Sequence, residues 1–366
     1  MNRRPSGQSS SWGATHSPFS RLKLRYRASE MESLRVVVTL DTEADDQWHH
    51  GGPLTTENVR WWQPFQDLCA RHGARPTYLI TSEIAEDDRA AAFLSPLVTN
   101  GVAEVGAHLH PWTTPPFRDE PGLAWNDPAH AYPCHVDEGL LQDKLFTLTA
   151  QIRESLGVTP TAFRAGRFGI DQVGARLLAK LGYVVDSSVT PFVSWSGNAG
   201  RPGRGGGPDF RRRHAYPFRV AGSGAPGLVE LPVTILPTYA VTRHCRPLLD
   251  RWDARPLRLV RRGLRAWGRP QPLWLRPRPE YDLDDLLALI GEARRLLLPS
   301  VVLMFHSSEL MPGGSPYRPT QGAVDDLLSV LDALFASLCR SETRFLTLSE
   351  AGRELARFDR LPTGEL

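Results

Sequence analysis

The chain has 366 residues, of which 41% are hydrophobic, so it is long enough to bury the core of one large or two ordinary domains. This composition excludes a disulfide-stapled mini-protein and a wholly disordered chain. The 43 basic and 40 acidic residues give a formal net charge of +3, which argues against a protein that binds nucleic acid through its overall charge.

The N-terminal residues 1–33 are rich in serine and arginine and show no hydrophobic periodicity, so we expect a disordered leader. They contain no apolar run of the length that a signal peptide needs, and nowhere in the chain do about 18 apolar residues follow one another. The four cysteines lie far apart without a CxxC pair, which indicates neither a zinc ribbon nor a disulfide framework. Scattered thiols suit a reducing compartment, and we expect a cytoplasmic protein.

Strand-like and helical segments alternate along most of the remaining chain. The predicted strands are Arg35–Leu40, Pro76–Ile80, Ala103–Ala107, Thr161–Phe163, Tyr183–Val185, Leu228–Val233, Val301–Phe305 and Phe345–Leu348. The predicted helices are Asn58–Arg71, Val136–Leu156, Gln172–Leu181, Asp282–Leu297 and Val324–Leu338. Continuous apolar runs such as RVVVTL and SVVLMF are typical of buried parallel strands. The alternation predicts an α/β fold in one domain over residues 34–356, with a tail at 357–366.

Two long insertions, at about 111–135 and 190–280, interrupt this alternation. Connections of such length are usually functional or disordered. We expect the first to border a site and residues 190–227 to be partly mobile. In the basic stretch 248–267, leucine, valine and tryptophan recur near helical spacing with arginines between them. Such a helix either makes peripheral contact with an anionic membrane or packs on the core with its arginines in solvent.

Paired polar residues follow two of the predicted strands. Asp41 and Glu43 end the first strand, and the carboxyl ends of parallel strands are where α/β folds bind ligands. Being two residues apart, they share a side of an extended chain. His108 and His110 repeat this spacing, and two imidazoles facing one way suit a metal ion. The alternatives are a turn or capping acid for the carboxylates and a structural role for the histidines.

Two further motifs stand at strand ends. The run FRAGRFG contains Arg164 and Arg167, and an arginine here can orient a catalytic carboxylate and keep it ionised. Its glycines leave backbone N–H groups near Arg167 and Phe168 free to face an oxyanion. His306 follows SVVLMF and is either a general acid or a hydrogen-bonded core histidine. Together the four motifs suffice for metal-assisted hydrolysis, and no phosphate loop or nucleophile elbow competes with them.

These motifs, in this order, resemble the polysaccharide deacetylase superfamily, also known as the NodB-homology or carbohydrate esterase family 4 proteins. TLDTE is similar to the first motif, HLHPW to the second, FRAGRFG to the third and LMFHSSEL to the last. DSSV resembles a segment before the fourth motif, while GAHLHPW and FHSSELMPGGSPY resemble the WalW-like branch, associated with bacterial surface-polysaccharide gene clusters. The resemblance covers about residues 34–348. It implies a distorted (β/α)7 barrel with long loop insertions, and a hydrolase that uses a divalent metal, usually zinc, to remove an N-acetyl group from a sugar.

The resemblance also implies a role for each site residue. Asp41 would be the general base, Arg164 its partner and His306 the general acid. Three side chains would hold the metal: Glu43, His108 and His110. Two departures leave alternatives open. Asp-Thr-Glu replaces the usual Asp-Asp, so Asp41 itself could touch the metal, and H-x-H replaces H-x-x-x-H, so His130 or His135 could stand in for His110.

These motifs say less about which residues bind the substrate. Trp112, Arg167 and Phe168 are candidates for substrate binding. Four tryptophans on predicted rim segments could stack on sugar rings or belong to the core: Trp48, Trp112, Trp125 and Trp195. We expect a cytoplasmic location, with the inner face of the membrane as the alternative, and in either place a nucleotide-linked or lipid-linked glycan is a more plausible substrate than cell-wall polymer. The alternatives are an amidase acting on a small cyclic amide and a non-catalytic carbohydrate-binding relative.

Overall fold

The computed structural model describes residues 33–45, 54–118, 130–200, 205–224, 227–238 and 271–366. Three expectations therefore fall outside the described residues: the disordered leader, the basic helix at 248–267, and the roles of Trp48 and Trp125. No helix in the described ranges is long and apolar enough to cross a membrane.

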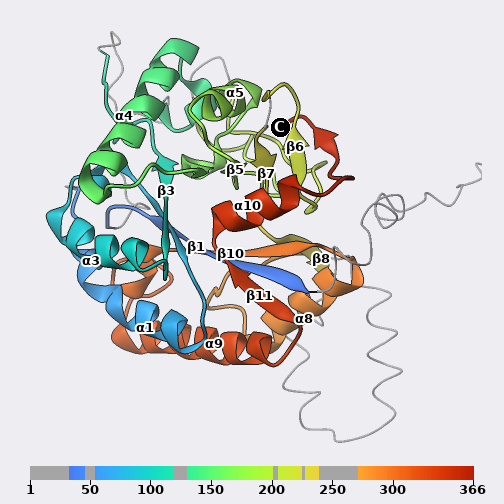
Figure 1. Ribbon diagram of the computed structural model, residues 1–366. Coiled ribbons are helices and arrows are strands. Elements are labelled where there is room, and N and C mark those ends of the chain that lie inside the picture. Colours follow the sequence, from blue (N-terminus) through green and yellow to red (C-terminus); the bar gives the residue numbers. More distant parts are fainter. Residues whose placement is uncertain (1–32, 46–53, 119–129, 201–204, 225–226, 239–270) are drawn as a thin grey trace, which may run out of the picture.

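A curled sheet runs through the molecule, and seven of its strands are parallel neighbours in the order β10-β1-β2-β3-β4-β5-β7 (Figure 1). These strands are β1 (Leu34–Thr42), β2 (Thr77–Ile80), β3 (Glu104–Leu109), β4 (Ala162–Ala165), β5 (Val185–Asp186), β7 (Val229–Glu230) and β10 (Ser300–His306). β11 (Thr343–Leu346) pairs with the start of β1, and β6 (Phe218–Val220) runs antiparallel to β7. All eight predicted strands overlap an observed one.

Helices cover the outer side of the sheet and surround it in Figure 1. They are α1 (Gln63–Arg71), α2 (Ser82–Ala85), α3 (Asp88–Thr99), α4 (Glu138–Leu156), α5 (Gln172–Lys180), α8 (Leu283–Arg295) and α9 (Gln321–Cys339). Short 3-10 helices lie between them: η2 (Glu57–Trp61), η4 (Pro133–His135), η5 (Gly166–Phe168) and η7 (Ser307–Leu310). The five predicted helices are present, whereas α2, α3 and α10 (Leu348–Ala356) were not predicted. A proline at position 96 lies inside α3 and interrupts its helical pattern.

An antiparallel pair, β8 (Ile235–Thr238) and β9 (Gln271–Trp274), flanks the last parallel strand. Val302 of β10 donates its N–H to Thr234 Oγ1 at 2.8 Å, and Met304 donates to the carbonyl of Leu275 at 3.2 Å. These bonds attach the pair to β10 on the side away from β1. The curled sheet and the helices around it form the distorted (β/α) barrel that the motifs imply.

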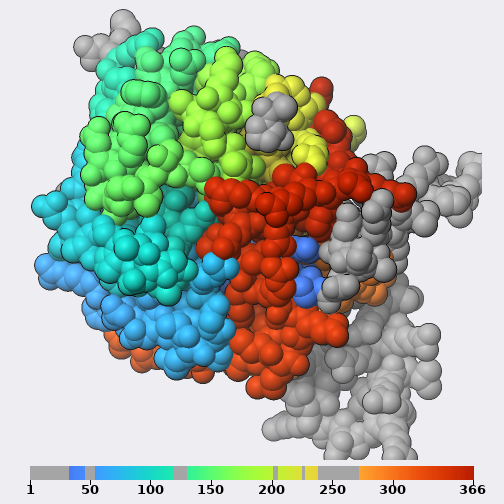
Figure 2. Space-filling view, in the orientation of Figure 1, coloured from blue at the N-terminus to red at the C-terminus, as the bar shows by residue number. Residues whose placement is uncertain are grey.

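The strand period of two divides β1 between two cores. Val36, Val38 and Leu40 pack into the layer between the sheet and the helices, while Val37 packs with apolar residues of α10. α10 contacts β1, β5 and β7, and it crosses the middle of the view in Figures 1 and 2. Asp41 lies four residues after Val37, so it is on the same inner side of the sheet but nearer the carboxyl end of the strand. The barrel is thus apolar near α10 and polar at the other end of its strands.

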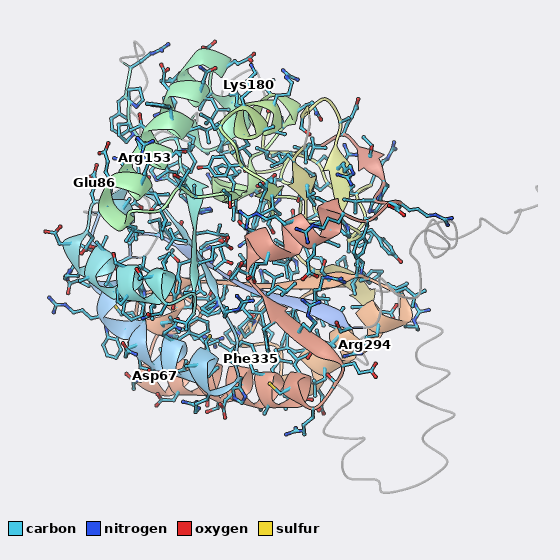
Figure 3. All side chains as sticks on the ribbon, viewed as in Figure 1. Asp67, Glu86, Arg153, Lys180, Arg294 and Phe335 are labelled. Carbon is cyan, nitrogen blue, oxygen red and sulfur yellow. The ribbon has the colours of Figure 1, made fainter. Side chains whose placement is uncertain are left out.

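Residues 357–366, expected as a tail, pack on the rest of the fold. β12 (Thr363–Gly364) pairs in parallel with β6, and Phe358 and Leu361 are buried. Exposed charged side chains also lie on the covering helices, for example Asp67 on α1, Arg153 on α4 and Lys180 on α5, which Figure 3 labels.

Two carboxyl groups face each other inside the barrel. Asp186 of β5 and Glu230 of β7 are register partners, and both are buried. Ser188 Oγ donates to Asp186 at 2.5 Å, and the backbone N–H of Val189 donates to Glu230 at 2.9 Å. Burial raises the pKa of both carboxyl groups, and the charge of Asp186 raises the pKa of Glu230 further. The pair therefore retains a proton at a pH where separate carboxyl groups would be ionised.

This shared proton predicts a pH-dependent effect of Glu230→Gln. In the wild type the unfolded chain loses the proton near pH 4, whereas the folded chain holds it to higher pH, so the free energy of unfolding falls as the pH rises above about 4. Glutamine keeps an acceptor for Val189 and offers Asp186 a permanent N–H. We expect the variant to be more stable than wild type at pH 8, by roughly 1 kcal/mol or more, with a smaller gain at pH 5.

Urea unfolding at both pH values measures this gain. Glu138→Gln, an exposed exchange of the same type at the start of α4, is the control and should change stability equally at both. A Glu230→Gln variant with the same stability difference at pH 5 and pH 8 would contradict the shared proton.

Candidate active site

Polar side chains from β1, β3, β4 and β10 meet at the carboxyl end of the barrel. Asp41 is the register partner of His306, and His108 is the register partner of Arg164, so the four sequence motifs converge. A cavity of about 340 Å³ opens there. It is lined by Asp41, Glu43, His108, His110, Trp112, Arg167, Phe168, Trp195, Asn198, Trp274, Arg276, Arg278, His306 and Tyr317.

Arg164 is fully buried and forms an ion pair beneath this cavity. Its Nη1 donates to Asp41 Oδ1 at 2.5 Å, and its Nη2 donates to Thr39 Oγ1 at 3.0 Å. Its Nε donates to the carbonyl of Ser187 at 2.8 Å, so the DSSV segment fixes the guanidinium from the other side. Burial alone would raise the pKa of Asp41, but the charge of Arg164 holds it below its usual value. Asp41 is therefore a carboxylate.

Glu43, His108 and His110 form a buried group whose ligand-type atoms lie within 4.8 Å of one another. Glu43 follows β1, His108 lies near the end of β3, His110 follows that strand, and β2 lies between β1 and β3. Glu43 Oε2 is 2.7 Å from His110 Nε2 and 3.6 Å from His108 Nε2. Burial would raise the pKa of Glu43, but the neighbouring imidazoles of His108 and His110 hold it far below its usual value. Glu43 is thus an anion that faces two imidazoles.

The histidine rings are fixed in ways that suit metal binding. His108 Nδ1 lies 2.9 Å from the carbonyl of Arg164, which can only accept, so Nδ1 carries the proton and Nε2 presents its lone pair toward Glu43. The ring of His110 packs against Gly166, where an added Cβ would lie 2.5 Å from His110 Nδ1. That nitrogen is buried without a hydrogen-bond partner among the described residues. Gly166 of the third motif therefore makes room for a ring of the second.

This donor set fits a divalent cation. One carboxylate and two imidazoles are common zinc ligands, and ligand atoms on a tetrahedral zinc are about 3.3 Å apart, comparable to the separations seen here. The two alternatives from the sequence, His130 and His135, are not part of the group within the described chain. The structure brings His110 to Glu43 instead.

His306 faces Glu43 from the opposite side, with Nε2 at 3.6 Å from Glu43 Oε1. Its Nδ1 lies 3.0 Å from Arg276 Nη2 and 3.4 Å from Glu309 Oε1. Because a guanidinium only donates, a neutral His306 accepts at Nδ1 and carries its proton on Nε2, toward the cavity. Glu309 would accept the Nδ1 proton of a charged imidazole. Burial would raise the pKa of Glu309, but Arg276, 2.7 Å away, lowers it to about 2.

The mouth of the cavity is aromatic. The ring of Trp112 lies 4.2 Å from that of His110, and Phe168 stacks on Trp195 at 5.4 Å with 21° between the planes. Trp274 contacts both members of that stack. Trp195 belongs to the second insertion, which therefore borders the site as the first does. Phe168 and Arg167 both have left-handed backbone angles, with φ of 59° and 52°, a strained conformation that is found at functional sites.

Several of these residues were absent from the sequence prediction. Glu309 lies three residues after His306 in the same motif, so its spacing could have indicated a contact. Arg276 and Tyr317 come from irregular segments, where no periodicity shows which way a side chain points, and Trp274 ends β9, a strand that was not predicted. Trp112, Arg167 and Phe168, the predicted substrate-binding residues, all line the cavity.

Comparison with known proteins finds likeness in structure only. No protein-family profile matches the sequence, and no curated protein matches it. A crystal structure from Mycobacterium smegmatis, assigned as a polysaccharide deacetylase, has a TM-score of 0.55 and 16% identity, and the match covers 92% of this chain and 94% of that one. A structure from Parabacteroides distasonis, assigned as a glycoside hydrolase/deacetylase, has a TM-score of 0.54 and 12% identity, covering 88% and 71%.

A crystal structure of PuuE allantoinase is also similar, with a TM-score of 0.50, 12% identity and coverage of 90% of this chain and 92% of that one. At these identities the likeness establishes the fold. The chain has the fold of the polysaccharide deacetylase superfamily, so the fold expected from the motifs is confirmed. The assignment to the WalW-like branch stays a prediction.

The buried ion pair predicts a large effect of Arg164→Met on stability. The variant leaves Asp41 ionised and buried without its counter-charge, and losing one partner of a buried pair costs about 3–5 kcal/mol. The double variant Arg164→Met with Asp41→Leu removes both charges and should regain most of this loss. Urea unfolding at pH 7 compares the two, with Arg153→Met on the exposed face of α4 as the control. A double variant no more stable than the single one would contradict the assigned interaction.

Proposed function

We propose that this chain is a metal-dependent hydrolase that removes an N-acetyl group from an amino sugar during the synthesis or modification of a surface polysaccharide. One observation carries the proposal. A carboxylate and two imidazoles suited to a divalent cation line the same aromatic-lined cavity as Asp41 and His306. The polysaccharide deacetylase fold, although it does not define a substrate, agrees with this reaction.

Glu43, His108 and His110 would hold the cation, for which zinc is our first choice. A bound divalent cation supplies Lewis acidity, which makes an amide carbonyl more electrophilic and water more acidic. Three protein ligands are also the number typical of catalytic zinc sites, whereas structural sites usually have four.

Asp41 and His306 supply the proton transfers of amide hydrolysis. Asp41, kept ionised by Arg164, accepts a proton from the water that attacks the acetyl carbon. The breaking C–N bond needs a proton on nitrogen, because an amine leaves poorly without one. His306 donates it from Nε2, the nitrogen directed toward the cavity, while it is a charged imidazolium, and it is left neutral with its Nδ1 proton directed to Glu309. Acetate and a free amino sugar result, and backbone N–H groups near Arg167 and Phe168 are candidates to stabilise the oxyanion.

The cavity favours one sugar unit over an extended polymer segment. Its volume of about 340 Å³ lies at the lower end of the range for small-molecule sites. Trp112, Phe168 and Trp274 offer faces for stacking on a sugar ring. We therefore propose a nucleotide-linked or lipid-linked precursor as substrate and a cytoplasmic enzyme, working at the inner face of the membrane when the glycan is lipid-linked.

A second candidate is an amidase that acts on a small cyclic amide. Its support is that an allantoinase has the same fold and that the cavity is small. The aromatic rim favours the sugar. A purely carbohydrate-binding role would need neither the Asp41–Arg164 pair nor the inward Nε2 of His306.

Metal analysis combined with acetate release tests the proposal. We expect about one zinc per chain, acetate release from N-acetylated sugars, loss of activity with a chelator and recovery with added zinc. His108→Ala should lose both metal and activity. The control is His72→Ala, which removes a histidine that pairs with Asp332 outside the site. A purified protein without stoichiometric metal, or with full activity after complete metal removal, would contradict the metal-dependent reaction.

Single replacements of the proposed acid and base should slow turnover without metal loss. We expect Asp41→Asn and His306→Ala each to lower kcat by about 10²- to 10⁴-fold, the usual contribution of a positioned acid or base. Metal content and thermal unfolding separate this effect from damage to the fold. Asp67→Asn on α1 is the exposed control and should keep normal kcat. Near-normal turnover in either site variant would refute its assigned role.

A further inference from the structure

Four arginines surround the candidate active site, and they divide into two kinds. Arg164 is neutralised by Asp41 at 2.5 Å, and Arg276 is neutralised by Glu309 at 2.7 Å. Arg167 and Arg278 also line the cavity, but neither forms an ion pair with a carboxylate in the described part of the chain. Within the described residues, the cavity therefore presents two guanidinium groups with which no carboxylate pairs.

Aromatic rings hold these two guanidinium groups in place. Arg167 lies over the ring of Tyr132, with 5.3 Å from its Cζ to the ring centroid. Arg278 lies over Trp274 and Tyr317, at 5.8 Å from each. Stacking on a ring positions a guanidinium while leaving its charge and its N–H edge available to an anion. Arg278 Nε is buried without a hydrogen-bond partner among the described residues.

The backbone also contributes to this arrangement. Arg167 and its neighbour Phe168 are both in the left-handed region, which a non-glycine residue adopts only at a cost. The ring of Phe168 contacts Trp274, and Trp274 also contacts Arg278. The two arginines are thus parts of one packed cluster on the wall of the cavity, although they come from segments more than 100 residues apart.

We propose that Arg167 and Arg278 form a subsite for a phosphate group on the N-acetylated sugar. Two unbalanced guanidinium groups match the charge of about −2 on a phosphate ester, whereas a carboxylate would balance only one of them. A neutral N-acetyl sugar would leave both charges uncompensated. This inference rests on the proposed function and narrows it to a phosphate-bearing sugar. The phosphate could belong to a free sugar phosphate or to the pyrophosphate link of a nucleotide or lipid precursor.

Kinetics with charged and neutral substrates test the subsite. The substrates are N-acetylglucosamine 1-phosphate, UDP-N-acetylglucosamine and the neutral methyl N-acetylglucosaminide. We expect Arg167→Gln and Arg278→Gln each to raise KM for the phosphorylated substrates by about 10- to 100-fold, and by at least about tenfold more than KM for the neutral sugar. Arg153→Gln on α4, outside the site, should alter none of the values. The preferred phosphorylated substrate distinguishes the simple phosphate from the pyrophosphate link.

A binding measurement separates this inference from the proposed reaction. Calorimetric titration of chelator-treated protein with N-acetylglucosamine 1-phosphate excludes phosphate–metal contact. Binding that weakens at least about 10-fold in both arginine variants and falls with added salt supports the subsite even if no acetate is released. Equal affinity of wild type and variants, or a preference for a neutral or carboxylated sugar, would overturn it even if deacetylation is found.

Discussion

The positive charge of Arg164 is excluded from water, and the arrangement of the site follows from how this charge is balanced. Arg164 is fully buried, so its cation is stable only because Asp41 balances it and because Thr39 and Ser187 accept its remaining hydrogen bonds. These partners come from the first strand and from the segment after β5, and the carbonyl of Arg164 itself orients His108. One residue therefore links the proposed base to a proposed metal ligand. Because Arg164 contacts both residues, Asp41 and His108 are held in a fixed position relative to each other.

The sequence was informative where the chain is regular. Continuous apolar runs identified the parallel strands, and the spacing of two placed Asp41 with Glu43 and His108 with His110 on the inward side. Prediction stopped where the backbone is irregular. Arg276 follows β9, which pairs with β8, a strand far from it in the sequence. Nothing in the residues around Arg276 therefore indicates a contact with His306. α3 was missed because a proline interrupts its pattern, and its burial against the sheet outweighs that local cost.

The choice of substrate depends on the residues that line the cavity and not on the barrel fold. Proteins with this fold include an allantoinase as well as proteins assigned as deacetylases, so the architecture alone is compatible with different amides. The aromatic cluster and the unbalanced Arg167 and Arg278 arise from the loops after the strands. The strand-end motifs were therefore recognisable in the sequence, whereas the identity of the substrate was not.

The position of β2 between the proposed ligands has a consequence for assembly. Glu43 directly follows β1 and His108 lies in β3, on either side of β2, so the two ligands come together only when all three strands lie side by side. An unfolded chain does not present this donor set as a local cluster, unlike a short zinc-finger loop. A cation would therefore bind after the barrel has formed and would link strands that are already in place. Protein made without metal would take up the cation later without having to refold.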